Sequence, residues 1–332
     1  MAPRVVVVTG ASAGVGRAVA LAFARQGDAV ALLARGGDRL REAKDEIEKL
    51  GGRALVVAAD VASASQVEVA AEQVERELGP IDVWVNNAMA TILCPAAEVQ
   101  PDEYERVTQV TYLGTVHGTL AALRRMKVRG RGVIVQVGSV LAYRGIPLQA
   151  PYSAAKHAVR GFTDSLRAEL LHEGSKIHVT MVQLPALNTP QLRWCRTRLP
   201  RQPRPVGRIF QPEMAAEAVV WAAAHRRREL FAGWPTVLAI QAQKFISSFL
   251  DRWIAKDVYR RMMTDEPLPP HGRRGNLFEA VSGPYGAHGP FDAEAHARSL
   301  HLWVNLHQAV VLAGVLGATA IVLVLLLLLG VL

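Results

Sequence analysis

Three polar residues in the middle of the chain have the types and the spacing that moving a proton requires. Tyr152 and Lys156 are four residues apart, so on a helix they lie on one face. A free tyrosine has a pKa of about 10, and a neighbouring ammonium group favours the phenolate and lowers that pKa. Ser139 lies 13 residues before Tyr152, at the end of an apolar run, where its hydroxyl would hydrogen-bond a substrate oxygen. These residues indicate acid–base chemistry on a carbonyl or an alcohol.

A glycine-rich segment, TGASAGVG at residues 9–16, directly follows a run of four valines. Glycines allow a tight turn and let an anion approach the first amides of the following helix, whose dipole favours negative charge. The position between an expected strand and an expected helix favours a dinucleotide-binding loop over a bare turn. In such a loop we expect the cofactor to contact Gly10, Ser12, Gly14, Val15 and Gly16.

These residues need a scaffold, and the hydrophobic pattern predicts one. Short apolar runs, which are typical of buried strands, lie at residues 4–8, 29–33, 54–59, 82–86, 132–137 and 177–182. Amphipathic stretches at residues 39–50, 65–78 and 213–225 predict helices, and residues 236–240 predict a last strand. The alternation predicts an α/β fold, a Rossmann-type doubly wound parallel sheet that forms a single domain over residues 1–240. Ligands of such sheets bind at the carboxyl ends of the strands.

The order of the motifs resembles the short-chain dehydrogenase/reductase family over about residues 4–240. The resemblance rests on the TGxxxGxG loop, on Asp60-Val61 and Asn86-Asn87-Ala88 at two strand ends, on Ser139, and on the YxxxK pattern of Tyr152 and Lys156. Pro185 and Thr189 are similar to the loop with which the family holds the nicotinamide carboxamide.

The resemblance implies an oxidoreductase in which Tyr152 is the acid and base, Lys156 lowers its pKa and binds ribose, and Ser139 orients the substrate. It also places the cofactor against Asp60, Val61, Asn87, Ala88, Pro185 and Thr189. The chain departs from the family pattern at two positions. Thr111 stands where the family has a catalytic asparagine, and Met89 replaces a glycine beside the cofactor loop.

The end of the second expected strand indicates which nicotinamide dinucleotide is bound. An acid there would meet a ribose 2′-hydroxyl, whereas an arginine would meet a 2′-phosphate. The sequence has no acid at this strand end and carries Arg35 directly after it. Arginine forks onto phosphate and stacks on adenine. We therefore expect NADP(H) rather than NAD(H).

The end of the chain predicts a membrane anchor. Residues 309–332 are 24 residues without a charge, and about 20 apolar residues span a bilayer. Trp303 precedes them as an interfacial aromatic residue would. We expect a transmembrane helix over residues 305–332 rather than a buried core helix. The four valines near the N-terminus are too short for a secretory signal. The expected arrangement is a single-pass anchor with the catalytic domain facing the cytoplasm.

The composition and the charge narrow the class of partner. Half of the 332 residues are hydrophobic, which excludes a wholly disordered chain. The two cysteines lack metal-ligand spacing, so we expect no metal and a reduced compartment. The net charge of +9 is uneven, because residues 193–208 hold six arginines and no acid: Arg193, Arg196, Arg198, Arg201, Arg204 and Arg208. This expected irregular loop would be solvated, or would bind lipid headgroups or an anionic substrate. Nucleic acid is disfavoured because no aromatic stacking platform is present.

The segment after residue 240 predicts one long amphipathic helix at residues 241–263, followed by a linker at residues 264–300. The helix carries a wide apolar stripe that includes Phe245, Phe249 and Trp253. Core packing, a homodimer contact or a position in the membrane interface would each bury such a stripe.

Together these features predict an NADP(H)-dependent oxidoreductase that interconverts a carbonyl and a secondary alcohol. The anchor and the apolar helix favour a small, lipophilic substrate taken at a membrane. The competing interpretation is a non-catalytic nucleotide-binding scaffold or redox sensor of the same fold, which the replacements at Thr111 and Met89 keep open.

Overall fold

The core of the protein is a seven-stranded parallel sheet. The computed structural model describes residues 3–269, 273, 275–281, 283, 286–313, 316 and 319. The strands lie in the order β10-β7-β6-β4-β1-β2-β3, and each pairs with its neighbours in parallel. Their bounds are β1 (Val5–Thr9), β2 (Ala29–Ala34), β3 (Arg53–Ala58), β4 (Ile81–Asn86), β6 (Val133–Val137), β7 (His178–Gln183) and β10 (Glu229–Phe231). The six strands expected up to residue 182 are confirmed, and so is the Rossmann-type parallel sheet.

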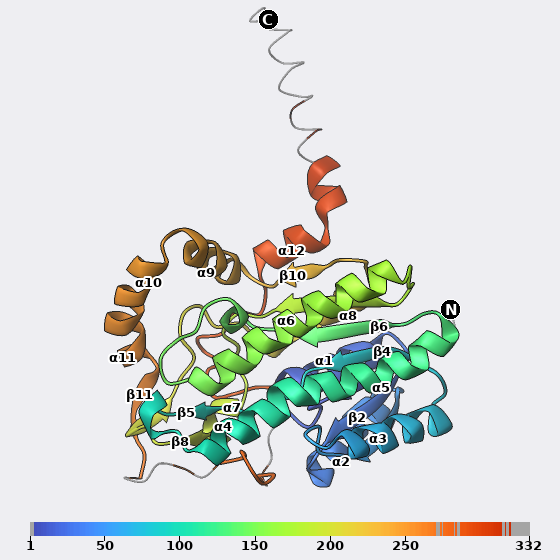
Figure 1. Cartoon of the computed structure of the whole chain (residues 1–332), viewed down its shortest axis with the longest axis horizontal. Coiled ribbons are helices and arrows are strands. Elements are labelled where there is room, and N and C mark those ends of the chain that lie inside the picture. The colour runs from blue at the N-terminus through green and yellow to red at the C-terminus, as the bar shows by residue number, and fades with distance from the viewer. Residues whose placement is uncertain are drawn as a thin grey trace, which may run out of the picture.

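Helices cover both faces of this sheet. Figure 1 shows α5 and α6 crossing one face of it. On that face α3 (Ala64–Glu77), α5 (Gly114–Arg129) and α6 (Ala150–His172) share one core with the strands, which includes the fully buried Trp84. On the other face α1 (Gly14–Arg25), α2 (Gly37–Lys49) and α8 (Pro212–Ala224) surround the fully buried Phe23. Because both faces are covered, the strands are continuous apolar runs rather than alternating ones.

The topology explains where a ligand can bind. From β1 the chain builds the sheet outward through β2 and β3, and then returns to place β4 on the other side of β1. The connections after β1 and β4 therefore diverge at their carboxyl ends, which leaves a crevice between them. The glycine-rich loop lies at this point, because α1 begins at Gly14 directly after β1.

The expected last strand at residues 236–240 is wrong. These residues belong to α9 (Trp234–Phe245), and the last strand is β10, which pairs with β7. Gly233, at φ +86°, turns the chain out of the sheet, and Pro235 stands in the first turn of the helix, where its missing amide hydrogen costs nothing. The apolar residues that follow show helical rather than alternating periodicity.

The single helix expected at residues 241–263 is also wrong. The chain forms α9, α10 (Ser247–Trp253), a π-helical turn (Ile254–Val258) and α11 (Tyr259–Arg261), with a break at Ile246. β11 (Met263–Pro267) then pairs with β9 (Arg201–Pro203). Figure 1 shows the three helices following one another at one end of the sheet. Burial also changes along the apolar stripe: Phe245 and Phe249 are 81% and 62% exposed, whereas Ile254 and Val258 are buried.

Residues 264–300 do not form the expected free linker in the part of them that the structure describes. Leu277 is completely buried, Phe291 is 8% exposed, and the amide of Phe291 donates to the side-chain oxygen of Asn188. A backbone bond from Gly14 to the Gly286 oxygen joins the segment to the start of α1. The segment therefore packs on the sheet domain through buried apolar side chains and backbone hydrogen bonds.

The predicted transmembrane helix falls mostly outside the described residues. α12 (Leu300–Leu306) packs on the sheet domain through Leu302, and a further helical stretch is described up to residue 313. Residues 314–315, 317–318 and 320–332 lie outside the described part. Within the described residues, no helix combines the length and the hydrophobicity that a membrane crossing requires.

Candidate active site

A cavity of about 360 Å³ opens at the carboxyl ends of the strands. It is lined by all but one of the residues predicted from the sequence: Gly10, Ser12, Gly14, Val15, Gly16, Arg35, Asp60, Val61, Asn87, Ala88, Ser139, Tyr152, Lys156, Pro185 and Thr189. Met89 lines it as well. Thr111 is the exception. These residues come from the ends of six strands and their loops, so the parallel sheet brings them together although they are distant in sequence.

The glycine-rich loop is tied to the end of β4. Gly10 is in the left-handed region at φ +68°, and its amide donates to the carbonyl of Leu33 at 2.7 Å. The hydroxyl of Thr9 accepts from the amides of Asn87 and Ala88, at 3.0 Å each. A Cβ on Gly16 would lie 2.2 Å from the Gly10 oxygen, so only glycine allows α1 to start this close to the turn. The loop is therefore rigid before any ligand arrives.

Ser139, Tyr152 and Lys156 meet at the floor of the cavity. Ser139 lies two residues after β6 and caps the short 3-10 turn that follows (Val140–Ala142), where its hydroxyl accepts from the Leu141 amide at 3.1 Å. Tyr152 and Lys156 stand in the first turns of α6. The Lys156 Nζ donates to the Val137 oxygen at 2.7 Å and lies 5.6 Å from the centre of the Tyr152 ring. The four-residue spacing thus places both side chains on one face, as expected.

Burial dominates the protonation of this group. It raises the pKa of Tyr152 to about 12, and a hydrogen bond from Ser139 acts in the opposite direction. Burial also lowers the pKa of Lys156 to about 8. We expected Lys156 to lower the pKa of Tyr152. In the protein without cofactor, however, the loss of solvent around the phenol dominates and the pKa is raised. At neutral pH Tyr152 is therefore a protonated hydroxyl.

Thr111 takes a place next to the cavity but not in its lining. It lies in a π-helical turn (Gln109–Leu113) between α4 (Pro101–Thr108) and α5, and it is fully buried. Its hydroxyl donates to the Ala90 oxygen and accepts from the Ala90 amide, both at 3.0 Å. With both functions of the hydroxyl satisfied by one residue, Thr111 holds the loop that carries Met89. The catalytic role predicted for Thr111 stays a prediction, and its contacts with Ala90 indicate a positioning role.

Basic side chains gather at the end of β2. The Arg35 guanidinium donates to three backbone oxygens of residues 276–278, at 2.6 to 3.3 Å. Arg106 forms an ion pair with Asp60 at 2.5 Å. Although burial opposes it, the hydrogen bond from Arg106 lowers the pKa of Asp60. Sequence reasoning missed Arg106 and residues 276–278, because no motif marks them and they reach the site only through the tertiary fold.

The arginines of residues 193–208 are largely paired, which corrects the expected irregular, uncompensated loop. The segment contains α7 (Gln191–Trp194), β8 (Arg196–Thr197), which pairs with β5 (Ile92–Leu93), and β9. The acids come from elsewhere in the sequence: Glu103 bonds both Arg196 and Arg198, Asp265 bonds Arg201, and Glu294 bonds Arg204. The positive charge of this segment is therefore largely balanced by acids from other parts of the chain.

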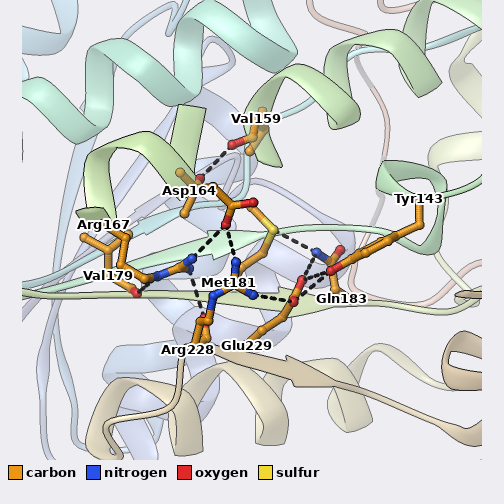
Figure 2. Close-up of polar contacts among 10 residues, drawn as sticks. Tyr143, Val159, Asp164, Arg167, Val179, Met181, Gln183, Arg228 and Glu229 are labelled. Atoms are coloured by element: carbon orange, nitrogen blue, oxygen red, sulfur yellow. Dashed lines mark hydrogen bonds and ion pairs between the residues drawn. The ribbon is translucent and has the colours of Figure 1, made fainter. Parts of the chain in front are cut away.

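A polar cluster supports the floor of the cavity from behind. Figure 2 shows the Tyr143 hydroxyl reaching Glu229 of β10, to whose carboxylate it donates at 2.7 Å. The Gln183 amide donates to the same carboxylate at 2.6 Å. Burial and the neighbouring Glu229 raise the pKa of Tyr143. Because Gln183 also packs against Gly138, the cluster braces the loop that carries Ser139.

The fold and the site together define a class of protein. Residues 4–198 match the family model described as short chain dehydrogenase, and the chain belongs to this family of oxidoreductases. It is 32% identical over 282 residues to an uncharacterized oxidoreductase, YxnA, of Bacillus subtilis, covering 84% of this chain and 79% of the relative. It is 33% identical over 223 residues to a 3-dehydrosphinganine reductase of Danio rerio, covering 65% of this chain and 67% of the relative.

A solved structure shares the architecture. It is a metagenomic short-chain oxidoreductase in complex with NADP, and it matches with a TM-score of 0.59 at 26% sequence identity. The match covers 69% of this chain and 96% of the solved chain. The part of the present chain beyond this match is therefore additional to the shared domain.

Proposed function

We propose that the protein is an NADP(H)-dependent reductase of a lipophilic ketone. The observation that carries this proposal is the convergence of Ser139, Tyr152 and Lys156 with the glycine-rich loop and Arg35 in one cavity. A proton donor, a dinucleotide-binding loop and a cation for a phosphate are the parts that carbonyl reduction by a nicotinamide cofactor needs.

The residues present fit NADP(H) in shape and charge. The loop at the start of α1 has no side chain at Gly10, Gly14 or Gly16, so a pyrophosphate can approach the N-terminus of the helix closely. The Gly14 amide donates to the Gly286 oxygen at 3.1 Å, so the cofactor would have to displace this bond to use that amide. Burial and the nearby positive charges of Arg106 and Arg39 lower the pKa of Arg35, and Asp60 acts in the opposite direction. This surplus of positive charge favours a 2′-phosphate over a 2′-hydroxyl. The solved relative in complex with NADP supports the same choice.

The protonation of the site favours reduction. When bound, the cofactor supplies a hydride to the carbonyl carbon. Tyr152, which keeps its proton at neutral pH, donates it to the carbonyl oxygen, and Ser139 holds that oxygen in place. Lys156 lies behind Tyr152, and its positive charge stabilises the phenolate that remains. Its lowered pKa, near 8, lets Lys156 return a proton to Tyr152 near neutral pH.

The surface beside the cavity favours a lipophilic substrate. Large apolar side chains of α9, α10 and α12 are solvent-exposed, namely Trp234, Leu238, Phe245, Ile246, Phe249, Trp253, Trp303 and Val304. The rings of Trp234 and His301 lie 5.9 Å apart, so α9 and α12 form one surface. An exposed apolar patch of this kind marks an interaction site. The relative named as a reductase of 3-dehydrosphinganine, a long-chain ketone, supports a lipid substrate.

We further propose that this surface lies on a membrane, with residues 305–332 as a single-pass anchor and the catalytic domain in the cytoplasm. The exposed patch adjoins α12, which leads directly into the uncharged residues 309–332. An aromatic and aliphatic patch next to an apolar segment of this length fits a bilayer interface. A second copy of the chain is the other partner that would cover the patch.

Turnover tests the catalytic proposal. Detergent-solubilised protein should oxidise NADPH with long-chain ketones such as 3-dehydrosphinganine and not with small polar sugars. Tyr152→Phe should reduce kcat by at least ~100-fold, the lower end of what a positioned acid contributes. Tyr259→Phe is the matched control, because Tyr259 is partly exposed on α11. Turnover that survives Tyr152→Phe would refute the assignment, and tight NADPH binding without turnover of any ketone would favour the non-catalytic scaffold.

Vesicle binding tests the membrane proposal. The full chain should float with vesicles of phosphatidylcholine and phosphatidylserine. The anchor alone would hold the full chain on them, so the patch is tested in a chain without residues 309–332, which should still float and should float less with Phe245→Ser and Phe249→Ser. Leu171→Ser, an equally exposed apolar position on α6, should leave it unchanged. If the double variant floats as well as wild type but dissociates from a dimer to a monomer, the patch is a homodimer contact instead.

A further inference from the structure

A segment from the C-terminal part of the chain closes one side of the cavity. We call residues 275–281 the C-terminal strap. Asn276 and Ala280 of the strap line the cavity beside Arg35 and Gly36. Arg35 and Asn276 are 241 residues apart in the sequence, and the strap lies beyond residues 4–198, which match the family model. The strap is therefore an addition to the dinucleotide-binding fold at the place where the adenosine end would lie.

The strap is held in place by buried side chains and backbone hydrogen bonds. Leu277 is completely buried in the core cluster that contains α3 and α5. The amide of Asn276 donates to the Trp194 oxygen at 2.9 Å. Gly275, at φ +63°, approaches the same oxygen so closely that a Cβ there would lie 2.3 Å from it. The strap thus sits directly on α7, which forms the neighbouring wall of the cavity.

Three backbone oxygens of the strap hold the Arg35 guanidinium. Arg35 donates to the oxygens of Asn276 at 2.6 Å, Phe278 at 2.8 Å and Leu277 at 3.3 Å. The Leu277 oxygen also accepts from Arg106 at 3.2 Å. These contacts fix the plane of the guanidinium in advance, which removes conformational entropy that a ligand would otherwise have to remove on binding. Backbone carbonyls are neutral, so they orient the guanidinium and leave its positive charge in place, whereas a carboxylate would neutralise it.

Asn276 carries an unsatisfied hydrogen-bond acceptor at the wall of the cavity. Its Oδ1 is buried and has no hydrogen-bond partner within the described part of the chain. A buried polar atom left without a partner costs free energy, and native proteins rarely keep one without a function. An amide oxygen only accepts hydrogen bonds. Adenosine offers donors to it, namely the amino group of adenine and the ribose hydroxyls.

We propose that the C-terminal strap is the outer wall of an adenosine 2′-phosphate subsite, in which Asn276 accepts a hydrogen bond from adenosine and the strap oxygens aim Arg35 at the phosphate. This inference rests on the proposed NADP(H) dependence. It adds that selectivity for the phosphorylated dinucleotide comes from residues outside the part of the chain that matches the family model.

Binding of 2′,5′-ADP, which carries the adenosine and the 2′-phosphate without the nicotinamide, tests the proposal apart from catalysis. Calorimetry at one fixed salt concentration should give a Kd about 3- to 10-fold higher for Asn276→Ala, the effect of one lost hydrogen bond. Leu277→Ala, which loosens the strap, should raise the Kd by at least as much. Glu279→Gln is the matched control, because Glu279 is exposed on the same strap and should bind as wild type does.

Two further arms make each outcome decisive. Amide hydrogen exchange of wild type should slow in residues 275–281 when 2′,5′-ADP binds, and this readout holds even if Leu277→Ala does not fold. Arg35→Ala tests the cofactor assignment itself. If Arg35→Ala loses 2′,5′-ADP while Asn276→Ala binds as wild type and the strap gains no protection, the strap proposal is overturned and the NADP(H) proposal stands. If Arg35→Ala binds 2′,5′-ADP as tightly as wild type does, the assignment of NADP(H) is refuted, and the strap proposal that rests on it is refuted too.

Discussion

Neutralising Glu103 tests how the wall of the cavity is held. The Glu103 side chain is only 1% exposed, yet it carries a charge. Its two oxygens accept a forked pair of hydrogen bonds from Arg198, at 2.8 Å each, and Arg196 bonds one of them as well. The same carboxylate accepts from the Gln100 amide at the start of α4. Glu103 therefore ties α4 to β8 and, through it, to α7.

Glu103→Gln removes the charge and keeps the shape and the acceptor for Gln100. Removing one partner of a buried ion pair costs about 3–5 kcal/mol. Arg196 and Arg198 are each about one quarter exposed, so water partly solvates them once the carboxylate is gone. We therefore expect a loss of about 2–3 kcal/mol in the free energy of unfolding. At roughly 2–4 °C per kcal/mol for a large domain, Tm should fall by about 4–12 °C.

The pH dependence gives an independent check of the same contact. Burial disfavours the ionised Glu103, but the hydrogen bonds from Arg198 and Gln100 outweigh it and lower its pKa. A carboxyl with a lowered pKa stabilises the fold above its unfolded pKa of about 4.3, and this contribution fades as the pH falls through the lowered value. The difference in stability between wild type and Glu103→Gln should thus be full at pH 7 and should shrink below about pH 4.

Thermal unfolding followed by circular dichroism in one detergent measures these differences. Glu105→Gln is the control, because Glu105 is exposed on the same helix and should change the free energy of unfolding by less than about 0.5 kcal/mol. Adding Arg198→Gln to Glu103→Gln should recover part of the loss, since the arginine then no longer lacks its partner. A Glu103→Gln protein as stable as Glu105→Gln at pH 7 would refute the reasoning.

Three further predictions concern the site itself. Lys156→Met should abolish most turnover yet raise Tm at pH 7, because burying the charged lysine, whose pKa falls to about 8, costs stability. This gain in Tm should shrink as the pH rises from 8 towards 10, where the lysine is neutral in both the folded and the unfolded protein. Gly16→Ala should lose NADPH binding and lower Tm. Gly161→Ala is the control and should raise Tm slightly, because it lies in a helix and an added Cβ there has nothing within 4 Å. Equal effects of the two substitutions would contradict the close approach at Gly16. Thr111→Val should lower the free energy of unfolding by about 1–3 kcal/mol, because the amide and the oxygen of Ala90 both lose their hydrogen-bond partner. It should leave the pH profile of kcat unchanged, and a shifted profile would show that Thr111 is a catalytic residue.

The sheet domain was predictable because each of its elements carries its own local signal. Buried parallel strands are short apolar runs, and the glycine-rich loop follows one of them at a fixed distance. The positions of Ser139, Tyr152 and Lys156 then follow from the topology, which delivers all strand ends to one edge. Their convergence in one cavity therefore needed no information beyond the sequence.

The C-terminal part was not predictable, because its structure depends on contacts between distant residues. The apolar spacing of residues 241–263 indicates one helix, whereas the chain breaks at Ile246. Ile254 and Val258 pack in a cluster with residues far away in the sequence, such as Leu93 and Leu148, which the local pattern does not reveal. The arginines of residues 193–208 seemed uncompensated because Glu103 and Glu294 lie about 90 residues away from the arginines they bind. Nor does any motif mark Asn276.

The 241-residue separation between Arg35 and Asn276 has a consequence for synthesis. During translation Arg35 emerges from the ribosome early, and Asn276 emerges only after 241 further residues have been added. The sheet up to β7 can pair during translation, but the wall beside Arg35 stays incomplete until the strap docks. A contact of such long range is slow to form, because a large loop must close first. The nascent protein thus forms its sheet well before the wall beside Arg35 is complete.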